Sequence, residues 1–445
     1  MKIIKPTILV IVGISGDLAK RKLLPAISQM SIAGVLPTDF KILGITRQTD
    51  IDIPGLFAFA EDSKYLEANL DLFSMDLLLL EDYEKLALKL QETEKNFSAP
   101  AQYLFYLSIP PQVSRPIIES IGKSSLAKKA DLKLLLEKPF GVDLDSATEL
   151  ASHIDKYFKA DQVYRIDHYL AKETVQNLLV FRADNSLFKQ TWNQKFISRI
   201  EIIASESLGI EGRADFYEQT GALRDLVQSH LLQLAALTLM DSCSDNCLGD
   251  VPACRLKALK NLYLPTDKPL TDYVKRGQYV GYQDEVKNSG SAVETFVSVT
   301  LSSKDPNWAG VPIVLSTGKA LAEKFTGIKI SYKKDKDNEA NELILKLQPD
   351  EGVELGLWTK SPGYEYEVIK KSLRFNFAEH YLKLPEAYEQ VLFNAINSDH
   401  SLFTSSAEVL ETWRILNVIQ TAWEMSADDL IYYQSGSDIS QVLNL

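Results

Sequence analysis

The sequence predicts two domains: an N-terminal α/β domain with a parallel sheet, and a larger α+β domain with a mainly antiparallel sheet. Short apolar runs alternate with helix-periodic stretches in the first part of the chain. After about Arg165, strand-like runs follow one another without helices between them. The 445 residues are also enough for two or three domains of ordinary size. We therefore divide the chain into residues 1–165 and residues 166–445.

The first domain opens with Thr7–Val12, an apolar, β-branched run that ends at a glycine and is typical of a buried parallel strand. Further strands are predicted at Lys41–Ile45, Tyr103–Ser108 and Leu132–Leu136. Helical spacing lies between them, for example over Tyr83–Leu90 and Val113–Ile121. Alternation of this kind favours a doubly wound sheet with helices on both faces.

The second domain begins with helical patterns over Lys172–Phe181 and Gly221–Met240. Runs rich in Val, Ile and Thr then predict the strands of an antiparallel sheet. These strands are Ile197–Ile203, Ala292–Leu301, Ile313–Ser316, Ile328–Tyr332 and Glu342–Leu347. The segment Pro385–Trp423 returns to a helical period.

Composition excludes several classes of function. Acidic residues outnumber basic ones by 60 to 48, and the net charge of −12 argues against a nucleic-acid partner. An anionic substrate must then be held by a local basic cluster. No apolar run reaches the roughly 18–20 residues of a membrane span, and the N-terminus lacks a signal-peptide cleavage pattern. We expect a soluble cytoplasmic protein.

The cysteines support the same compartment. Cys243, Cys247 and Cys254 are odd in number, which suits a reducing environment better than a disulfide framework. Their spacing is not that of a zinc site, and no histidine lies near them in the sequence. We expect free thiols and no metal.

A glycine-rich turn follows the first predicted strand and leads into a helix. Gly13 permits the tight turn, Gly16 lets the backbone approach a pyrophosphate, and Ala19 allows close packing of helix on strand. Ser15 replaces the second glycine of the usual pattern, so an ordinary strand-to-helix turn remains an alternative. The position after the first strand favours a Rossmann-like dinucleotide-binding domain. The residues expected at the cofactor are Gly13, Ile14, Ser15, Gly16, Asp17 and Leu18.

The end of the second strand bears on the choice of cofactor. Enzymes that use NAD usually have an acidic residue there, whereas NADP enzymes use arginine for the 2′-phosphate. This sequence has Arg47, which favours NADP, with NAD as a weaker alternative. The alternative interpretation of Arg47 is a solvated surface arginine that binds no cofactor.

Two further groups of residues suggest an anionic substrate. Lys138 follows the strand Leu132–Leu136 at the sheet edge where ligands bind, and its bond to Pro139 is a candidate for the cis form. An ordinary surface lysine without a ligand is an equally good interpretation of Lys138. His168 and Lys172 would share one face of a helix and could clamp a phosphate. Asp167 before them could be a helix cap, but the concentration of Arg, Asp, His, Tyr and Lys in this short stretch favours a function.

These residues resemble those of the glucose-6-phosphate dehydrogenase family. The most specific block is Arg165–Leu170 (RIDHYL) with Lys172–Glu173. Supporting blocks follow in the family's order: GISGDLAK at Gly13–Lys20, EKPFG at Glu137–Gly141, RGQYVG at Arg276–Gly281, QPDEG at Gln348–Gly352 and PEAYE at Pro385–Glu389. The resemblance covers nearly the whole chain from about Thr7 to Trp423.

The resemblance implies oxidation of β-D-glucose 6-phosphate at C1 to 6-phospho-D-glucono-1,5-lactone, with hydride transfer to NADP, the first step of the oxidative pentose phosphate pathway. It identifies His230 as the general base, although the apolar neighbours of His230 alone would favour a structural histidine. Asp167 would orient that base and stabilise its imidazolium. The resemblance also implies a homodimer formed through the large sheet.

The remaining roles are also carried over from the family. The substrate would be bound by Lys138, His168, Tyr169, Lys172, Glu206, Asp225, Lys319 and Lys324. Near the cofactor we expect Arg47, Met75, Asp76, Tyr106 and Lys138 in addition to the glycine turn. Ala171 stands where the family usually has glycine, a change that a helix would tolerate.

Two other functions are compatible with parts of this pattern. Sugar oxidoreductases of the glucose–fructose oxidoreductase and inositol dehydrogenase type share the two-domain plan and a Glu-Lys-Pro turn, but they lack the block at residues 165–173. A non-catalytic sugar-phosphate or NADP sensor could retain the fold. Loss of His230 or Asp167 would favour the sensor, and both residues are present.

Overall fold

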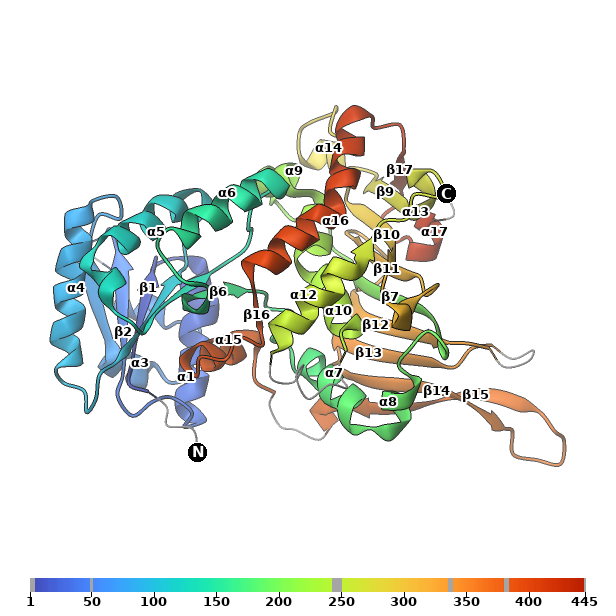
Figure 1. The fold of residues 1–445 in the computed structure, drawn as a ribbon, viewed down its shortest axis with the longest axis horizontal. Helices are drawn as coiled ribbons and strands as arrows, with labels where there is room; N and C mark the ends of the chain where they lie inside the picture. The colour runs from blue at the N-terminus through green and yellow to red at the C-terminus, as the bar shows by residue number, and fades with distance from the viewer. Residues whose placement is uncertain (1–4, 49–50, 242–249, 335–338, 380–383, 444–445) are drawn as a thin grey trace. The chain divides into compact units, whose positions relative to one another are not determined.

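The computed structural model describes residues 5–48, 51–241, 250–334, 339–379 and 384–443. The chain divides into two compact units (Figure 1). The first unit comprises Met1–Ala171 and Pro385–Val409, and the second comprises Lys172–Leu384 and Leu410–Leu445. The boundary thus falls after Ala171 rather than Arg165, and a late segment returns to the first unit, which the sequence did not predict.

The first unit is built on a seven-stranded sheet with the order β16-β6-β5-β4-β1-β2-β3. All neighbouring strands are parallel except β16, which runs antiparallel to β6. The strands are β1 (Thr7–Val12), β2 (Phe40–Thr46), β3 (Leu70–Ser74), β4 (Gln102–Leu107), β5 (Leu132–Leu136), β6 (Val163–Ile166) and β16 (Phe403–Thr404). The predicted parallel sheet is confirmed.

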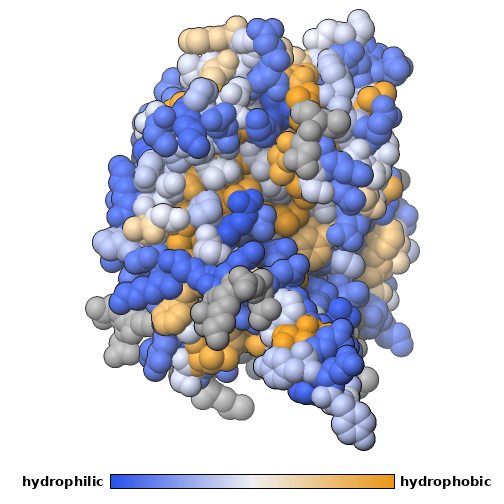
Figure 2. All heavy atoms as spheres, turned by 90° about the vertical axis from the view of Figure 1, so that its right-hand side faces the viewer, coloured by the Kyte–Doolittle hydropathy of each residue, from blue (hydrophilic) through white to orange (hydrophobic). Residues whose placement is uncertain are grey.

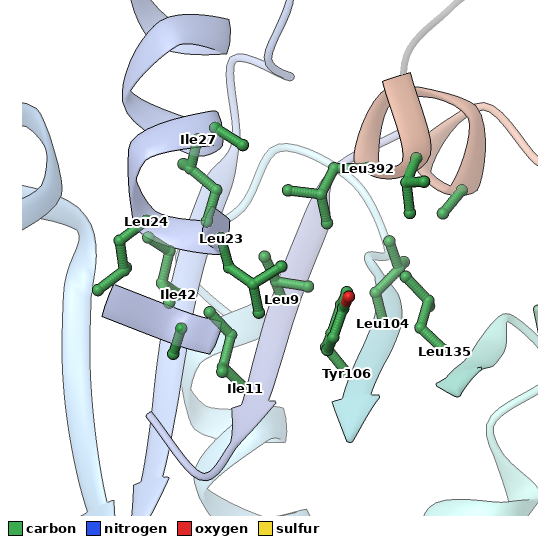
Figure 3. Close-up of a cluster of buried hydrophobic side chains, with 14 of the residues drawn as sticks. Leu9, Ile11, Leu23, Leu24, Ile27, Ile42, Leu104, Tyr106, Leu135 and Leu392 are labelled. Atoms are coloured by element: carbon green, nitrogen blue, oxygen red, sulfur yellow. The ribbon is translucent and has the colours of Figure 1, made fainter. Parts of the chain in front are cut away.

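Side chains alternate between the two faces of the sheet along each strand, and those of β1 are buried on both faces. Helices therefore cover both faces of this sheet. Leu9 and Ile11 of β1 face the π-helix η1 (Ala19–Leu23), α1 (Leu24–Ile32) and α15 (Ala387–Ile396), as Figure 3 shows. Ile8 and Val10 face the opposite core. That core is completed by α4 (Leu80–Glu94), α5 (Ser114–Lys123) and α6 (Leu144–Asp155).

The returning segment is tied to the sheet by polar side chains. The buried Lys133 ammonium on β5 donates to the carbonyl of Ala395 at 2.5 Å and to Ser398 Oγ at 2.8 Å. Gln102 Nε2 donates to the carbonyl of Ile396 at 2.8 Å. Desolvation, followed by repulsion from Lys5, lowers the pKa of Lys133 to about 8.

The second unit contains a ten-stranded sheet with the path β15-β14-β13-β12-β7-β11-β10-β9-β17, and β8 pairs with β10 off this path. Most pairs are antiparallel, as predicted, but β7 with β11 and β9 with β17 are parallel. The strands are β7 (Ile197–Ser205), β8 (Leu262–Tyr263), β9 (Val274–Tyr279), β10 (Phe296–Ser303), β11 (Ile313–Gly318), β12 (Phe325–Tyr332), β13 (Glu342–Gln348), β14 (Gly352–Lys360), β15 (Val368–Asn376) and β17 (Leu430–Tyr433).

The helical region of the second unit is more broken than its periodicity suggested. The stretch predicted as one helix consists of the end of α9 (Ala214–Ala222), the π-helix η5 (Leu223–Leu231) and α10 (Leu232–Leu239). Gly221, with φ of +65°, separates the first two. The remaining helices are α7 (Glu173–Asp184), α8 (Ser186–Thr191), α12 (Val251–Asn261), α13 (Leu270–Tyr273), α14 (Tyr282–Glu285), α16 (Ser406–Met425), which begins in the first unit, and α17 (Ile439–Leu443).

The structure corrects the prediction for one cysteine. Cys254 is disulfide-bonded, so the free thiol expected there is wrong, because sequence spacing does not report which sulfurs meet in space. Cys243 and Cys247 lie outside the described residues.

Across the described ranges, no helix has the length and apolar character needed to cross a membrane. A cytoplasmic location stays a prediction.

Candidate active site

The glycine turn after β1 has the geometry that a dinucleotide requires. Gly13 has φ of +89°, and a Cβ there would lie 2.4 Å from the carbonyl oxygen of Ser108, so only glycine fits. The Gly16 N–H donates to the Gly13 carbonyl at 3.0 Å, and the helix follows directly. The side chain of Ile14 is fully buried, and its N–H donates to the Ile45 carbonyl at 3.2 Å, which ties the turn to β2. The turn therefore presents backbone and a helix N-terminus at the carboxyl end of β1.

The other predicted cofactor residues lie at the ends of the neighbouring strands. Arg47 is exposed and follows β2 directly, as predicted from the sequence. The N–H of Met75 donates to the Thr46 carbonyl, and the Met75 side chain is buried. The carboxylate of Asp76 accepts the N–H of Leu78, which gives Asp76 a role in shaping its own turn.

Tyr106, which is expected near the cofactor, has its side chain among core residues. Its ring is fully buried in the core between the sheet and α1 (Figure 3), and its hydroxyl donates to Glu137 Oε1 at 2.5 Å. Burial, with the nearby charge of Glu137, raises the pKa of Tyr106 well above its usual value. The hydroxyl of Tyr106 thus supports the loop after β5, and its place near the cofactor stays a prediction.

The loop after β5 collects charged groups at the carboxyl edge of the sheet. The Lys138–Pro139 bond is cis, which confirms the candidate form. Glu137, which sequence reasoning did not assign to the site, is half-buried, and desolvation raises the pKa of its carboxyl. The charge of Lys138 opposes that rise, whereas the charge of Asp167, which directly follows the adjacent β6, adds to it. The Glu-Lys-Pro sequence at the end of a predicted strand is the sequence signal that could have assigned Glu137 to the site.

Asp167 caps a turn and not a helix. One oxygen of its buried carboxylate accepts the N–H of Tyr169 at 3.0 Å, two residues further on. Such a turn competes with helix formation, and α7 begins only at Glu173. The expectation that His168 and Lys172 share a helical face is therefore wrong, as is a helical setting for Ala171.

Three of the residues expected to bind the substrate follow Asp167 closely, namely His168, Tyr169 and Lys172. His168 is half-buried and meets the ring of Tyr169 edge-on, with ring centroids 4.9 Å apart. Lys172 is half-buried and precedes α7 with extended backbone angles. The structure thus places an imidazole, a phenol and an ammonium on one short non-helical segment.

In the second unit, Glu206 and Lys319 form an ion pair. Ser205 of β7 lies opposite Gly318 of the parallel strand β11, so the residues that follow these two strands leave the sheet side by side. The Lys319 ammonium lies 2.5 Å from Glu206 Oε2. The lysine side chain is only 4% exposed, whereas that of Glu206 is 37% exposed. The carboxylate is therefore available to a ligand, and the ammonium is held behind it.

Asp225 and His230 lie on the π-helix η5, which packs against β7 and β11. They occupy positions i and i+5, which is the hydrogen-bonding repeat of a π-helix, so they are one turn apart. His230 is 2% exposed and Asp225 is half-buried. Lys324 is exposed in the loop between β11 and β12.

Tyr217 connects these groups and was not predicted. Desolvation, followed by the charges of Asp225 and Glu294 and, more weakly, by that of Glu206, raises the pKa of its buried hydroxyl well above the ordinary value. The Lys319 ammonium lies 5.8 Å from the centre of its ring. A tyrosine in an amphipathic helix carries no sequence signal that separates this role from core packing.

Taken by itself, each unit carries one half of the chemistry. The first unit offers a dinucleotide turn, and the second offers carboxylates, a cation and a histidine that can bind hydroxyl groups and accept a proton. Among the described residues, no group of three or more His, Cys, Asp or Glu side chains could hold a metal ion.

Comparison with known proteins agrees with this division. Residues 10–177 match the NAD-binding domain of glucose-6-phosphate dehydrogenase, and residues 179–443 match the C-terminal domain. The chain is 34% identical to a glucose-6-phosphate 1-dehydrogenase of Chlamydia muridarum, over 97% of this chain and 93% of that protein. A relative of the same name from Borreliella burgdorferi is 33% identical over 93% of this chain and 91% of its own length.

A solved structure, described as glucose-6-phosphate dehydrogenase in complex with its substrate glucose-6-phosphate, matches the whole chain and 98% of its own. Its TM-score is 0.91 at 29% identity. This chain belongs to the glucose-6-phosphate dehydrogenase family.

Proposed function

We propose that this protein oxidises β-D-glucose 6-phosphate at C1 to 6-phospho-D-glucono-1,5-lactone and that it uses NADP. The family supports the reaction, and the cluster of Glu206, Asp225, His230 and Lys319 in the second unit carries the assignment of residues. The sugar oxidoreductases that lack the block at residues 165–173 and a non-catalytic sensor are both less consistent with that cluster.

In this mechanism His230 removes the proton of the C1 hydroxyl. A buried imidazole on a packed helix has few orientations, so the base loses little entropy when substrate binds. The proton leaves as the C–H bond breaks, and a neutral histidine is suited to this task near neutral pH. Asp167 stabilises the imidazolium that results, which is the role that a carboxylate plays in other Asp–His pairs.

Glu206 and Asp225 accept hydrogen bonds from the sugar hydroxyls. The half-exposed carboxylate of Glu206 is fixed by Lys319, which prevents it from turning into solvent. The 6-phosphate is bound by His168, Tyr169, Lys172 and Lys324. Charge-assisted contacts of this kind supply the local positive charge that an acidic protein needs.

The turn Gly13–Gly16 is suited to a dinucleotide, because it lies between β1 and a helix whose start has no side-chain cap, and a side chain at residue 13 would collide with Ser108. Its backbone would hold the pyrophosphate, and the exposed Arg47 would pair with the 2′-phosphate of NADP. A bound nicotinamide cofactor would supply the acceptor for the hydride that leaves C1. Lys138, at the end of β5, is placed on the same sheet edge.

Comparison of phosphorylated and free sugar tests the substrate. We expect the wild type to turn over glucose 6-phosphate with a kcat/KM at least about 10³ times that for glucose, because several charge-assisted contacts depend on the phosphate. Lys172→Met should reduce kcat/KM for glucose 6-phosphate about 10- to 100-fold and leave the value for glucose within about 2-fold. Equal losses for both sugars would contradict a phosphate-binding role.

We also propose a homodimer formed through the large sheet of the second unit. β15 is its edge strand, and an open edge is a template for pairing. Leu373 on that strand is 63% exposed, and Phe375 is also exposed. Figure 2 shows the face on the right-hand side of Figure 1, where apolar residues form small groups among hydrophilic ones.

Light scattering tests the dimer. The wild type should have twice the mass of one chain, and Leu373→Glu should shift it toward the monomer. Val418→Glu, at another exposed apolar position on α16, serves as the matched control and should remain dimeric. A wild-type monomer at micromolar concentration would contradict the proposal.

A further inference from the structure

Glu294 is a buried acidic residue for which neither the sequence motifs nor the proposed reaction supplies a role. It precedes β10 and is only 8% exposed. Its Oε1 accepts the N–H of Leu223 at 2.9 Å, and its main-chain carbonyl accepts the N–H of Ala222 at 3.0 Å. One residue therefore receives two consecutive N–H groups of a segment far away in the sequence.

These two N–H groups belong to the start of η5, the helix of Asp225 and His230. The first N–H groups of a helix have no partner within the helix and need one elsewhere. Ala222, at the N-cap position, supplies no side-chain cap. Glu294 supplies that cap from another element, and its carboxylate also interacts favourably with the positive end of the helix dipole.

Close packing against Gly221 fixes the carboxylate. A Cβ at residue 221 would lie 2.5 Å from Glu294 Oε1, and the φ of +65° already favours glycine there. Burial raises the pKa of Glu294, which the hydrogen bond from Leu223 and the nearby Arg224 and Arg276 oppose. Gly221 and Glu294 together determine where the helix begins.

The next residue, Thr295, connects to the other side of the site. Its carbonyl accepts the N–H of Lys319 at 2.9 Å. Its hydroxyl lies 2.9 Å from the hydroxyl of Tyr433, which donates to the Lys319 carbonyl at 2.7 Å. Two adjacent residues thus hold the helix of Asp225 and His230 on one side and the backbone of Lys319 on the other.

We propose that Glu294 is a positioning residue, which sets η5 in register with the ends of β7 and β11 and so places Asp225 and His230 relative to Glu206 and Lys319. This inference rests on the proposed roles of those four residues. It assigns to Glu294 no contact with substrate or cofactor. Its effect on the reaction passes entirely through the helix start.

Substitutions that keep or remove the acceptor test this proposal. Glu294→Gln retains an acceptor oxygen and should keep kcat within about 3-fold of wild type, whereas Glu294→Met, of similar shape, removes the acceptor. Misplacement by about 1 Å can reduce a rate on the order of 10²-fold, so we expect Glu294→Met to lower kcat about 10- to 100-fold. The KM for NADP should change less than about 2-fold, because the cofactor turn belongs to the first unit.

A direct readout of the helix start accompanies the kinetics. Hydrogen exchange of a peptide over residues 222–231 should become faster in Glu294→Met and stay near wild type in Glu294→Gln. If Glu294→Met does not fold, Glu294→Asp replaces it, because its shorter side chain keeps the charge but withdraws the acceptor from Leu223. As for Glu294→Met, we expect Glu294→Asp to lower kcat and to make hydrogen exchange of this peptide faster.

Glu218→Met is the matched control for lost stability alone. Glu218 is a partly buried acid of the same unit that accepts Tyr282, Ser291 and Asn288 but no N–H of η5. The Glu218→Met variant should have a lower unfolding temperature and a kcat within about 3-fold of the wild-type value. Wild-type kcat in folded Glu294→Met and Glu294→Asp, with His230→Asn inactive, would overturn the positioning role alone. Wild-type kcat in His230→Asn would instead overturn the proposed base, and the positioning role with it.

Discussion

The ammonium of Lys319 and the carboxylate of Glu206 meet at 2.5 Å because they follow two neighbouring parallel strands in register. Among the strands that the structure describes in this sheet, β7 with β11 is one of two parallel pairs, and the other pairs are antiparallel. A parallel pair brings two carboxyl ends to the same edge, which an antiparallel pair cannot do. This local exception in topology creates the polar edge against which η5 packs.

The two partners of this pair should respond unequally to substitution. Glu206→Gln leaves the buried Lys319 ammonium without its counter-charge and should lower the free energy of unfolding by about 1–3 kcal/mol. Lys319→Met removes the buried charge itself and should cost less. Urea unfolding of both variants and of the double variant checks this, and the double variant should recover part of the loss. A larger loss for Lys319→Met would contradict the account.

Arg47 should determine the choice between the two nicotinamide cofactors. Arg47→Gln removes a charge-assisted contact to the 2′-phosphate and should raise the KM for NADP about 10- to 100-fold. The KM for NAD should change less than about 3-fold. Lys95→Gln, an exposed cation at the C-cap of α4, is the control and should affect neither. The measurement is a saturation curve for each cofactor with wild type and Arg47→Gln. An equal increase in KM for NADP and for NAD would contradict a role of Arg47 in cofactor choice.

Lys133 should make stability rise with pH in the mildly alkaline range. Its pKa is about 8 in the folded protein and near 10.4 in an unfolded chain, so between these values the unfolded state binds more protons. The free energy of unfolding therefore increases as pH rises through this window. Buried tyrosines with raised pKa values act in the opposite direction above about pH 10.

Urea midpoints at pH 8.0, 8.8 and 9.6 would measure the rise for wild type and for Lys133→Met. The variant should lose the increase, because methionine has no proton to release. Parallel profiles for the two proteins would show that folding does not perturb Lys133.

Asp167 and His230 should act as one unit in catalysis. We expect Asp167→Asn to lower kcat about 10²- to 10³-fold and His230→Asn at least as much. The double variant should be no more than about 3-fold worse than His230→Asn, because the carboxylate acts through the base. Multiplicative losses in the double variant would mean that the two side chains act independently.

Features encoded by short stretches of sequence were predictable. The strand β1 and the turn at Gly13 follow from apolar periodicity and from a backbone angle that only glycine adopts readily. The cis bond at Pro139 was a candidate because proline lowers the cost of that form. Only the family resemblance predicts catalytic roles for Asp167 and His230, which periodicity alone would assign to a cap and a core.

Features that depend on distant segments were not predictable. The strands β14 and β15 carry many charged residues and lack the apolar runs that marked other strands. The segment Pro385–Val409 joins the first unit through contacts such as that of Lys133 with Ala395. Glu294 gave no signal, because a carboxylate that caps a remote helix looks like any other acid in a sequence.

The central claim is tested most directly by following reduced-cofactor absorbance with glucose 6-phosphate. Wild type and His230→Asn would be compared with NADP and with NAD, and substrate binding would be measured by calorimetry on both proteins. We predict turnover by the wild type with NADP, and a loss of at least about 10²-fold in His230→Asn, which should still bind the sugar phosphate. A folded wild type that binds both ligands but turns over neither cofactor would contradict the assignment as an enzyme.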